Sequence, residues 1–195
     1  SVGQDISFLI PYLKLPYIDN LVVRGEFLIS KEDFKKWKSQ FSNARNLVAG
    51  LINSKTIEPE RFADLKFVCY EVIQPSIFPS AGFEVLKDYG FDVVKNTKVL
   101  MKDNLTESLL SKMLLQWRNT LQYEIDGIIV ESDHIYSRKN ENPKHAFAFK
   151  MIMDDQRAET SVLDVIWTPS KDGYLKPRVH IQPVTIGGAT IEYVT

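Results

Sequence analysis

The feature that most limits the possible folds of this chain is a change of pattern near residue 155. Before that point, short runs rich in β-formers alternate with segments whose apolar residues recur at helical spacing. After it, three short β-rich runs follow one another, separated by turn signals such as Lys171-Asp172-Gly173. Consecutive short strands without helices between them are typical of a small β-barrel. The sequence therefore predicts an α+β domain over residues 1–155 and the start of a barrel over residues 156–195.

The expected elements follow from periodicity and from start and stop signals. Strands are expected at residues 21–29, 65–73, 125–131, 145–152, 161–167, 175–184 and 190–194. Helices are expected at residues 31–41, 81–89 and 105–119. Ser30 is expected to cap the first helix, because Asp33 follows at the spacing of a capping box. Gly90 is expected to end the second helix.

Composition restricts the class of protein and its partners. The chain has 195 residues with 44% apolar and 25% charged residues, enough for a buried core. A net charge of −1 argues against a uniformly basic surface, although a local basic groove remains compatible with it. No apolar run approaches the roughly 20 residues of a membrane span, so we expect a soluble protein without a membrane partner. The single cysteine, Cys69, excludes an internal disulfide, and its apolar neighbours predict a buried, inert thiol.

Four segments place charged residues inside or beside apolar runs. Glu26 follows Gly25 within an expected strand, and Asp126 stands before a glycine that lets a ligand approach the backbone. Lys150 shares a strand face with two alanines, which leave room around its ammonium group. Arg45 lies in the segment 43–50, beside Asn46.

Each of these segments alone is weak evidence, since an isolated charged residue in a strand is commonly a solvent-exposed residue at the edge of a sheet. Together, two carboxylates, a lysine and an arginine from separate segments predict a site for phosphate and a divalent metal ion. The three histidines lack the mutual spacing of metal ligands, so structural or surface roles are expected for them.

The order of the motifs resembles the NAD-dependent DNA ligases over nearly the whole chain. The resemblance rests on five motifs and on the segment 175–190, which looks like the opening of that family's oligonucleotide-binding barrel. The motifs are Arg24-Gly25-Glu26, Ala44-Arg45-Asn46, Phe67-Val68-Cys69-Tyr70, Glu124-Ile125-Asp126-Gly127 and Ala146-Phe147-Ala148-Phe149-Lys150. The resemblance implies an antiparallel-sheet nucleotidyltransferase fold, ATP-grasp-like as in DNA ligases, followed by a partial OB-fold.

The resemblance also implies a role for each matched residue. Glu26 would contact the adenosine ribose and help to bind a metal ion, and Tyr70 would stack on adenine. Asp126 would position a catalytic Mg²⁺. Lys150 would contact the adenylate α-phosphate and stabilise its charge. Arg45 would bind a phosphate of the nucleotide or of the nick.

The chain departs from the family's pattern in several places. The family's nucleophilic lysine belongs to a Lys-x-Asp-Gly motif that these residues do not contain, so we expect a fragment that does not adenylate itself. Asn53 stands where the family usually has a second arginine, and Glu131 where it usually has a lysine. These differences suggest a divergent member, of viral or phage origin.

The expected activity is that of a DNA ligase which seals nicks in duplex DNA through an enzyme-adenylate formed from NAD. Its expected partners are nicked double-stranded DNA, NAD or AMP, and Mg²⁺, with a monomer as the functional form. A cytoplasmic location is expected, at the nucleoid or in a viral replication compartment. Two alternatives remain open: an ATP-dependent polynucleotide ligase or capping enzyme, and an inactive relative that only binds nucleic acid.

Overall fold

The structure is a computed structural model that divides into two compact units, Ser1–Lys150 and Met151–Thr195. It describes residues 3–54, 59–100, 104–137, 141–151, 157–186 and 189–195. The boundary expected near residue 155 lies outside the described residues.

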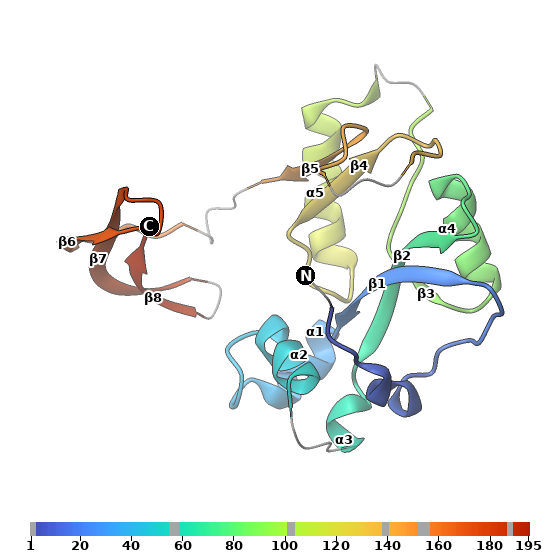
Figure 1. Cartoon of the computed structure of the whole chain (residues 1–195), viewed down its shortest axis with the longest axis horizontal. Coiled ribbons are helices and arrows are strands. Elements are labelled where there is room, and N and C mark those ends of the chain that lie inside the picture. Colours follow the sequence, from blue (N-terminus) through green and yellow to red (C-terminus); the bar gives the residue numbers. More distant parts are fainter. Residues whose placement is uncertain (1–2, 55–58, 101–103, 138–140, 152–156, 187–188) are drawn as a thin grey trace. The chain divides into compact units, whose positions relative to one another are not determined.

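The first sheet of the larger unit has the strand order β1-β2-β3. Strand β1 (Val22–Leu28) pairs antiparallel with β2 (Lys66–Gln74), as expected from the sequence. The short strand β3 (Asp92–Val93) instead runs parallel to β2, which the expectation of an antiparallel sheet did not include. Helix α4 (Pro79–Asp88) connects β2 to β3 (Figure 1). Such a helical crossover lets two consecutive strands run side by side in the same direction.

Helix α4 packs closely on the first sheet. A Cβ atom on Gly82 would lie 3.3 Å from the Val72 side chain, so the helix and β2 are in tight contact. Leu86 and Cys69 are fully buried in this layer. The expectation that Cys69 is buried is confirmed, and this burial raises the pKa of its thiol to about 11.

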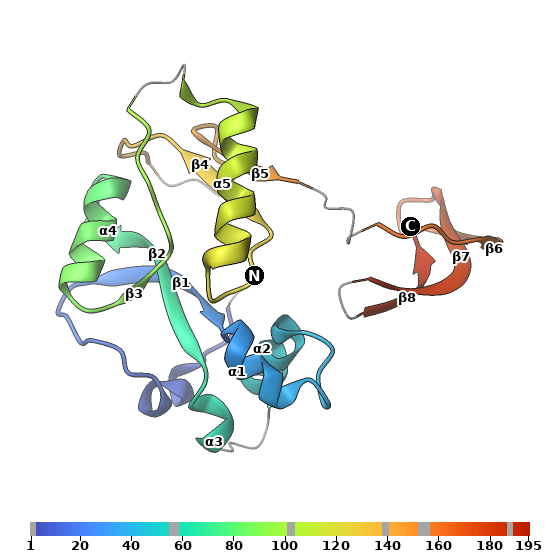
Figure 2. The same ribbon diagram turned by 180° about the vertical axis from the view of Figure 1, so that it is seen from behind.

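The second sheet is a hairpin of β4 (Gly127–Glu131) and β5 (Ala146–Lys150). Helix α5 (Glu107–Thr120), capped by Thr106, lies along it (Figure 2). Leu110 and Leu114 of α5 are buried, as is Ile128 of β4. The apolar stripe of this helix is therefore core packing, as its helical spacing predicts.

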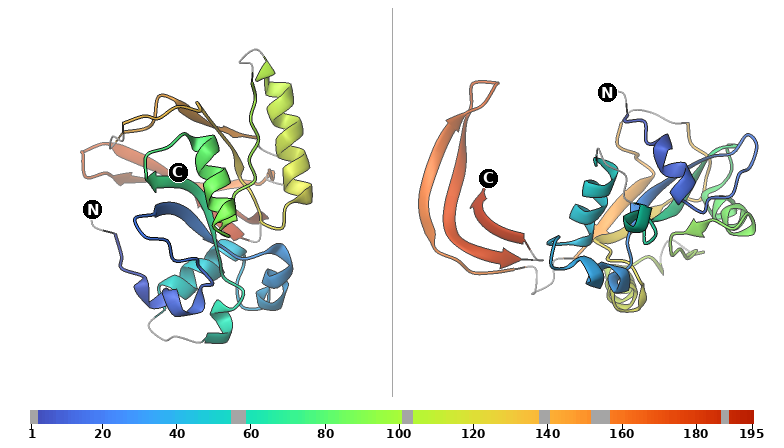
Figure 3. Two further views of the ribbon diagram at one scale, coloured as in Figure 1. Left: turned by 90° about the vertical axis from the view of Figure 1, so that its right-hand side faces the viewer. Right: turned by 90° about the horizontal axis from the view of Figure 1, so that it is seen from below.

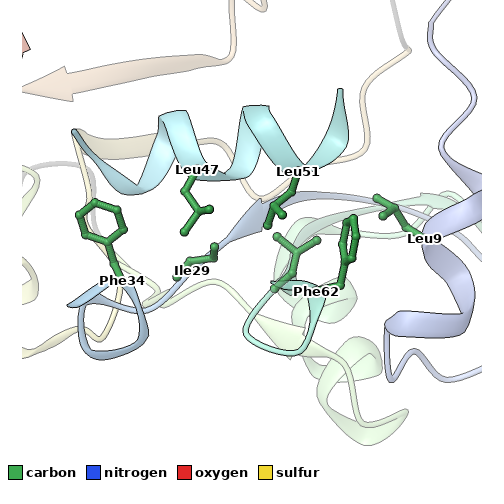
Figure 4. Packing of buried hydrophobic residues seen from close by; sticks show 7 residues of the cluster. Leu9, Ile29, Phe34, Leu47, Leu51 and Phe62 are labelled. Carbon is green, nitrogen blue, oxygen red and sulfur yellow. The ribbon is translucent and has the colours of Figure 1, made fainter. Parts of the chain in front are cut away.

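The main core lies where short helices cover the end of β1. These elements are η1 (Ser7–Tyr12), α1 (Lys31–Phe34), η2 (Lys35–Trp37), α2 (Ala44–Ile52) and α3 (Pro59–Phe62). In Figure 4, Leu47 and Leu51 of α2 point toward Ile29 and Phe62. This packing fixes α2, and with it the segment that carries Arg45.

The helix expected at residues 31–41 is shorter in the structure. Ser30 caps it as predicted, since its hydroxyl accepts the Asp33 N–H at 3.0 Å. The α-helix ends at Phe34 and continues as a 3₁₀ turn to Trp37. Phe41 lies beyond the helix, and its ring packs against Gly50 of α2, 3.3 Å from where a Cβ atom of that residue would be. Tertiary packing therefore overrides the local periodicity.

The smaller unit contains a sheet of the order β6-β7-β8, visible as a curved ribbon in the right panel of Figure 3. Its strands β6 (Val162–Pro169), β7 (Leu175–Ile186) and β8 (Ala189–Val194) pair antiparallel and lie where the sequence predicts them. Within residues 157–186 and 189–195, Ile181 is the single buried residue. The assignment of this sheet to an oligonucleotide-binding barrel stays a prediction.

Among the described residues, no helix combines the length and apolar character that crossing a membrane requires.

Candidate functional site

Glu26 lies on β1 beside a point where two strands come unusually close. It pairs with Val68 of β2 and is exposed. A Cβ atom on the preceding Gly25 would lie 2.5 Å from the Val68 carbonyl oxygen. Only glycine fits there, so Gly25 allows β2 to pass close to the strand that presents Glu26.

Tyr70 lies on β2 at an irregularity of the same strand pair. Arg24 pairs with Glu71 and Gly25 with Cys69, so Tyr70 falls at the register shift between them. The residue is 41% exposed, although most of β2 is at least partly covered. Beside it, Arg24 and Glu71 form an ion pair of 3.3 Å. A partly exposed aromatic residue therefore stands next to charged groups on the first sheet.

Asp126 stands at the end of the loop between α5 and β4. Arg118, in the last turn of α5, donates to the carbonyl of Ile125 at 3.3 Å and to that of Asp126 at 3.0 Å. Lys31 also ties this helix end down, since its ammonium group donates to the carbonyls of Arg118 at 2.6 Å and Leu121 at 3.0 Å. A cation at a helix C-terminus is favourable, because the last carbonyls carry partial negative charge.

Lys150 ends β5 directly opposite Gly127, the residue after Asp126. A Cβ atom on Gly127 would lie 2.9 Å from Cγ of Lys150 and would also meet the Phe149 carbonyl oxygen. Glycine is therefore required for the lysine stem to cross this position. The sequence predicted close approach at Gly127, and in the structure the Phe149 carbonyl oxygen and the Lys150 side chain both come close to it.

Arg45 joins the two sheets. It lies in the first turn of α2, whose N-cap Asn43 accepts the Asn46 N–H at 2.8 Å. The guanidinium group of Arg45 donates to the Asp126 carboxylate at 2.8 Å. This hydrogen bond with Asp126 is the main cause that raises the pKa of Arg45, and the charges of Asp126, Glu26 and Glu124 add to it. One cation thus lies within electrostatic reach of carboxylates from β1 and from the α5–β4 loop.

Four of the predicted residues, Arg45, Asp126, Glu26 and Lys150, are connected through contacts or charge interactions around Asp126. Arg45 donates a hydrogen bond to Asp126, and the charge of Glu26 also raises the pKa of Arg45. The Lys150 side chain passes close to Gly127, the residue after Asp126. Tyr70 lies on β2, the strand that pairs with the strand of Glu26. All five side chains are exposed, so a ligand can reach them.

Sequence reasoning missed Arg118 and Lys31, which hold the Asp126 loop. A signal for Arg118 existed, because a basic residue in the last turn of a helix commonly bonds nearby carbonyls. Lys31 had no such signal, since its carbonyl partners lie about ninety residues away in the chain.

Asn53, at the position of a usual arginine, ends α2 as its C-cap. Its side-chain amide donates to the Ala49 carbonyl at 2.9 Å. The Asn53 side chain therefore bonds back to its own helix, whereas the longer side chain of an arginine could extend away from the helix.

The histidines take part in ring contacts. His145 stacks on Tyr136 with ring centroids 3.8 Å apart, and His180 stacks on Tyr193 at 4.7 Å. His134 lies edge-on to Phe78. In the described part of the chain, no group of three or more His, Cys, Asp or Glu side chains is arranged to hold a metal ion.

A cavity of about 530 Å³ lies elsewhere in the larger unit, between the segment 12–16 and the starts of β2 and β3. None of the five predicted site residues lines it. The chemistry suggested by the charged residues therefore belongs to the sheet junction and not to this cavity.

Taken together, these elements form a mixed α/β domain with antiparallel-rich sheets and a polar site where the sheets meet. Comparison with protein families matches residues 6–153 to the NAD-dependent DNA ligase adenylation domain, and the chain belongs to this family. It is 38% identical to a DNA ligase of Acanthamoeba polyphaga mimivirus over 205 residues, covering 100% of the chain and 31% of that protein. It is 31% identical to a DNA ligase of Lawsonia intracellularis over 196 residues, covering 90% and 28%. The chain thus spans about a third of the length of these relatives.

Proposed function

We propose that this chain supplies the adenylation domain of a DNA ligase that seals nicks in duplex DNA through an enzyme-adenylate formed from NAD. The observation that carries the proposal is the contact between Arg45 and Asp126, with Glu26 in electrostatic reach. These three residues come from three separate segments of the chain and match three motifs of the ligase family. The family membership supports the use of NAD, and the relatives' names support the ligase activity.

The phosphate end of the site comprises Arg45, Asp126 and Lys150. Both partners of the Arg45–Asp126 ion pair are largely exposed, at 77% and 62% of their side chains. Such exposed pairs contribute little to stability, so Arg45 can exchange the carboxylate for a phosphate group. Lys150 would then stabilise the negative charge that grows on the α-phosphate as its bond to the leaving group breaks.

Two carboxylates at this junction fit the preferences of Mg²⁺. This ion is commonly held by one or two carboxylates together with substrate phosphates and water, so a set of three protein ligands is not required. Asp126 and Glu26 would hold it once Arg45 has moved to a phosphate. When bound, Mg²⁺ would offset phosphate charge and orient the transferring group.

The nucleoside end of the site comprises Tyr70 and Glu26. An accessible aromatic ring offers adenine a stacking surface, because offset stacking needs no particular polar edge of the base. Glu26 would accept hydrogen bonds from the ribose hydroxyls. The strands of the smaller unit would open an oligonucleotide-binding barrel that contributes to DNA contact.

The three chemical steps require a nucleophile that these 195 residues do not show in the form Lys-x-Asp-Gly. We propose that this amine comes from outside them. It would attack the α-phosphorus of NAD, forming a P–N bond and expelling nicotinamide mononucleotide. The adenylate would pass to the 5′-phosphate at a nick, and the 3′-hydroxyl would then displace AMP.

The test is covalent labelling of the full-length protein. It is incubated with Mg²⁺ and NAD or ATP radiolabelled in the adenylate, and then run on a denaturing gel. Label from NAD supports the proposal. Label from ATP alone would identify an ATP-dependent ligase, and an unlabelled, folded protein would identify an inactive relative.

Replacing Lys150 tests the phosphate assignment within the same protein. Lys150→Ala is expected to lower nick sealing by about a hundredfold or more, because it removes charge stabilisation in the transition state. Lys144→Ala, an exposed lysine just before β5, serves as the matched control. Normal sealing by the Lys150 variant would show that the assignment is wrong.

A further inference from the structure

The far end of the β4–β5 hairpin is joined to helix α4 and to the segment after β3 by the Asp133 carboxylate. Asp133, two residues after β4, accepts the backbone N–H of Ser80 at 2.9 Å and its hydroxyl at 2.8 Å. It also accepts from the Lys98 ammonium group at 2.6 Å. Ser80 lies in the first turn of α4, which packs on β2, and Lys98 follows β3. Asp133 therefore connects the second sheet to the layer that covers the first.

These contacts hold a charged junction together. The Glu131 carboxyl, at the end of β4, lies close enough to Glu71 of β2 for their charges to interact. Although Glu131 as a residue is exposed, burial of its carboxyl raises the pKa, and the charge of Glu71 raises it further, while His145 opposes the effect. Glu71 is paired with Arg24 at 3.3 Å, which offsets part of its charge, and an attractive contact nearby opposes the repulsion that remains between Glu71 and Glu131.

The position of this contact along β4 determines which part of the site it affects. Lys31 and Arg118 tie down the beginning of β4, next to Asp126 and Lys150. Asp133 fixes the other end of β4, where Glu131 lies near Glu71 of β2. Glu71 directly follows Tyr70 in the sequence. The two ends of the site are thus held by different groups.

Building on the proposed function, we propose that Asp133 is a positioning residue that sets the separation of the two sheets at the nucleoside end of the site. It contacts neither nucleotide nor DNA. It acts through the first turn of α4 and Lys98, by holding the end of β4 near the strand that carries Tyr70. The phosphate end keeps its geometry without it.

The first test measures self-adenylation by the full-length protein as a function of NAD concentration. Asp133→Ala is expected to raise KM for NAD by about fivefold or more and to change kcat little, since it removes ground-state binding of the nucleoside and leaves the phosphate contacts. Asp64→Ala is the matched control, because Asp64 pairs with Lys36 at 3.1 Å in a comparably exposed ion pair away from the junction. A purely structural role would lower the amount of active protein in both variants and leave both KM values unchanged.

Removing the repulsion should rescue the loss. The double variant Asp133→Ala, Glu131→Gln is expected to recover a lower KM than Asp133→Ala alone, because the facing carboxylates no longer push the sheets apart. A KM in Asp133→Ala equal to that of the parent, in protein that self-labels normally, would overturn the proposal.

A second test does not depend on ligase activity. Spin labels are placed on Asp88→Cys of α4 and Lys144→Cys before β5, both exposed positions, while the native Cys69 is buried. Asp133→Ala is expected to lengthen and broaden the distance distribution between the labels, and Asp64→Ala to leave it unchanged. If the parent protein fails to label from NAD, the proposed function fails, and this distance measurement alone decides the role of Asp133. An unchanged distribution in Asp133→Ala would overturn it.

Discussion

Glu131 shows how one residue changes the electrostatic potential where the two sheets meet. It stands where the ligase family usually has a lysine, and it faces Glu71 with Asp133 nearby. The pKa of its carboxyl is raised first by burial and then by these two charges. A folded-state pKa above the ordinary value means that the folded protein holds the proton more tightly. Ionisation of Glu131 therefore lowers stability as pH rises through and above its ordinary pKa.

We predict that Glu131→Lys stabilises the domain slightly at neutral pH. The new cation would meet Glu71 and Asp133 where a repelling anion stood before. The gain should not exceed about 1 kcal/mol, because the position is exposed and solvent screens the charges. Urea unfolding measures it, with Glu141→Lys as the control for net charge. A destabilised Glu131→Lys protein would show that Glu131 has a favourable partner at this junction.

Asp133 has the opposite sign of pH dependence. Its hydrogen bonds with Lys98 and Ser80 lower its pKa from 3.8 to about 2. The stability it contributes is present above its ordinary pKa of 3.8 and is lost as pH falls toward about 2.

We predict that Asp133→Asn is less stable than the parent above pH 4 by roughly 1 kcal/mol, after allowance for solvent screening of Lys98. This difference should shrink as pH falls from 4 toward 2, because the parent carboxylate becomes protonated. Urea unfolding at a series of pH values checks it. A difference that stays constant over that range would contradict the assigned pKa.

At the scale of elements, the hairpin β4–β5 depends on one glycine. Gly127 lies opposite Lys150, and a Cβ atom there would meet the Phe149 carbonyl oxygen and the lysine stem. Backbone cannot give way as a flexible side chain can, so a larger residue must displace β5. The geometry of the element and the position of Lys150 are therefore set together.

We predict that Gly127→Ala costs about 1–3 kcal/mol of stability, as overpacking does elsewhere. It should also reduce labelling from NAD in the full-length protein beyond the loss of folded material, because Lys150 moves. Gly3→Ala is the control, since nothing lies within 4 Å of its added Cβ atom. Full labelling by a folded Gly127→Ala protein would contradict the idea that close passage fixes the lysine.

At the scale of the whole molecule, the two units differ in how much core they possess. The larger unit buries a cluster that includes Leu9, Leu47 and Phe62. In the described residues of the smaller unit, only Ile181 is buried, while Trp167 and Leu175 are 59% and 64% exposed. A three-stranded sheet with so little buried apolar surface lacks the main source of folding free energy.

We predict that residues 1–150 alone unfold in one cooperative transition, whereas residues 157–195 alone show none. Thermal unfolding followed by circular dichroism checks both fragments. A cooperative transition of residues 157–195 at micromolar concentration would show that their exposed apolar side chains find partners within the fragment or between copies.

Several elements followed from the sequence because their signals are local. The strands at β1, β2 and β6 to β8, the Ser30 cap and the stripe of α5 depend on residues a few positions apart. The parallel strand β3 and the early end of the first helix escaped prediction. Both depend on contacts between segments distant in the chain, which pattern alone does not contain.

For the candidate site, the sequence by itself determined which residues were available and, through the order of their motifs, the ligase family. The tertiary structure decided that Arg45 pairs with Asp126, that Lys150 crosses Gly127, and that Lys31, Arg118 and Asp133 hold the sheets. The physical reason is range: strand alternation and helix capping act over two to four residues, whereas ion pairs and close packing depend on where distant segments meet once the core has formed.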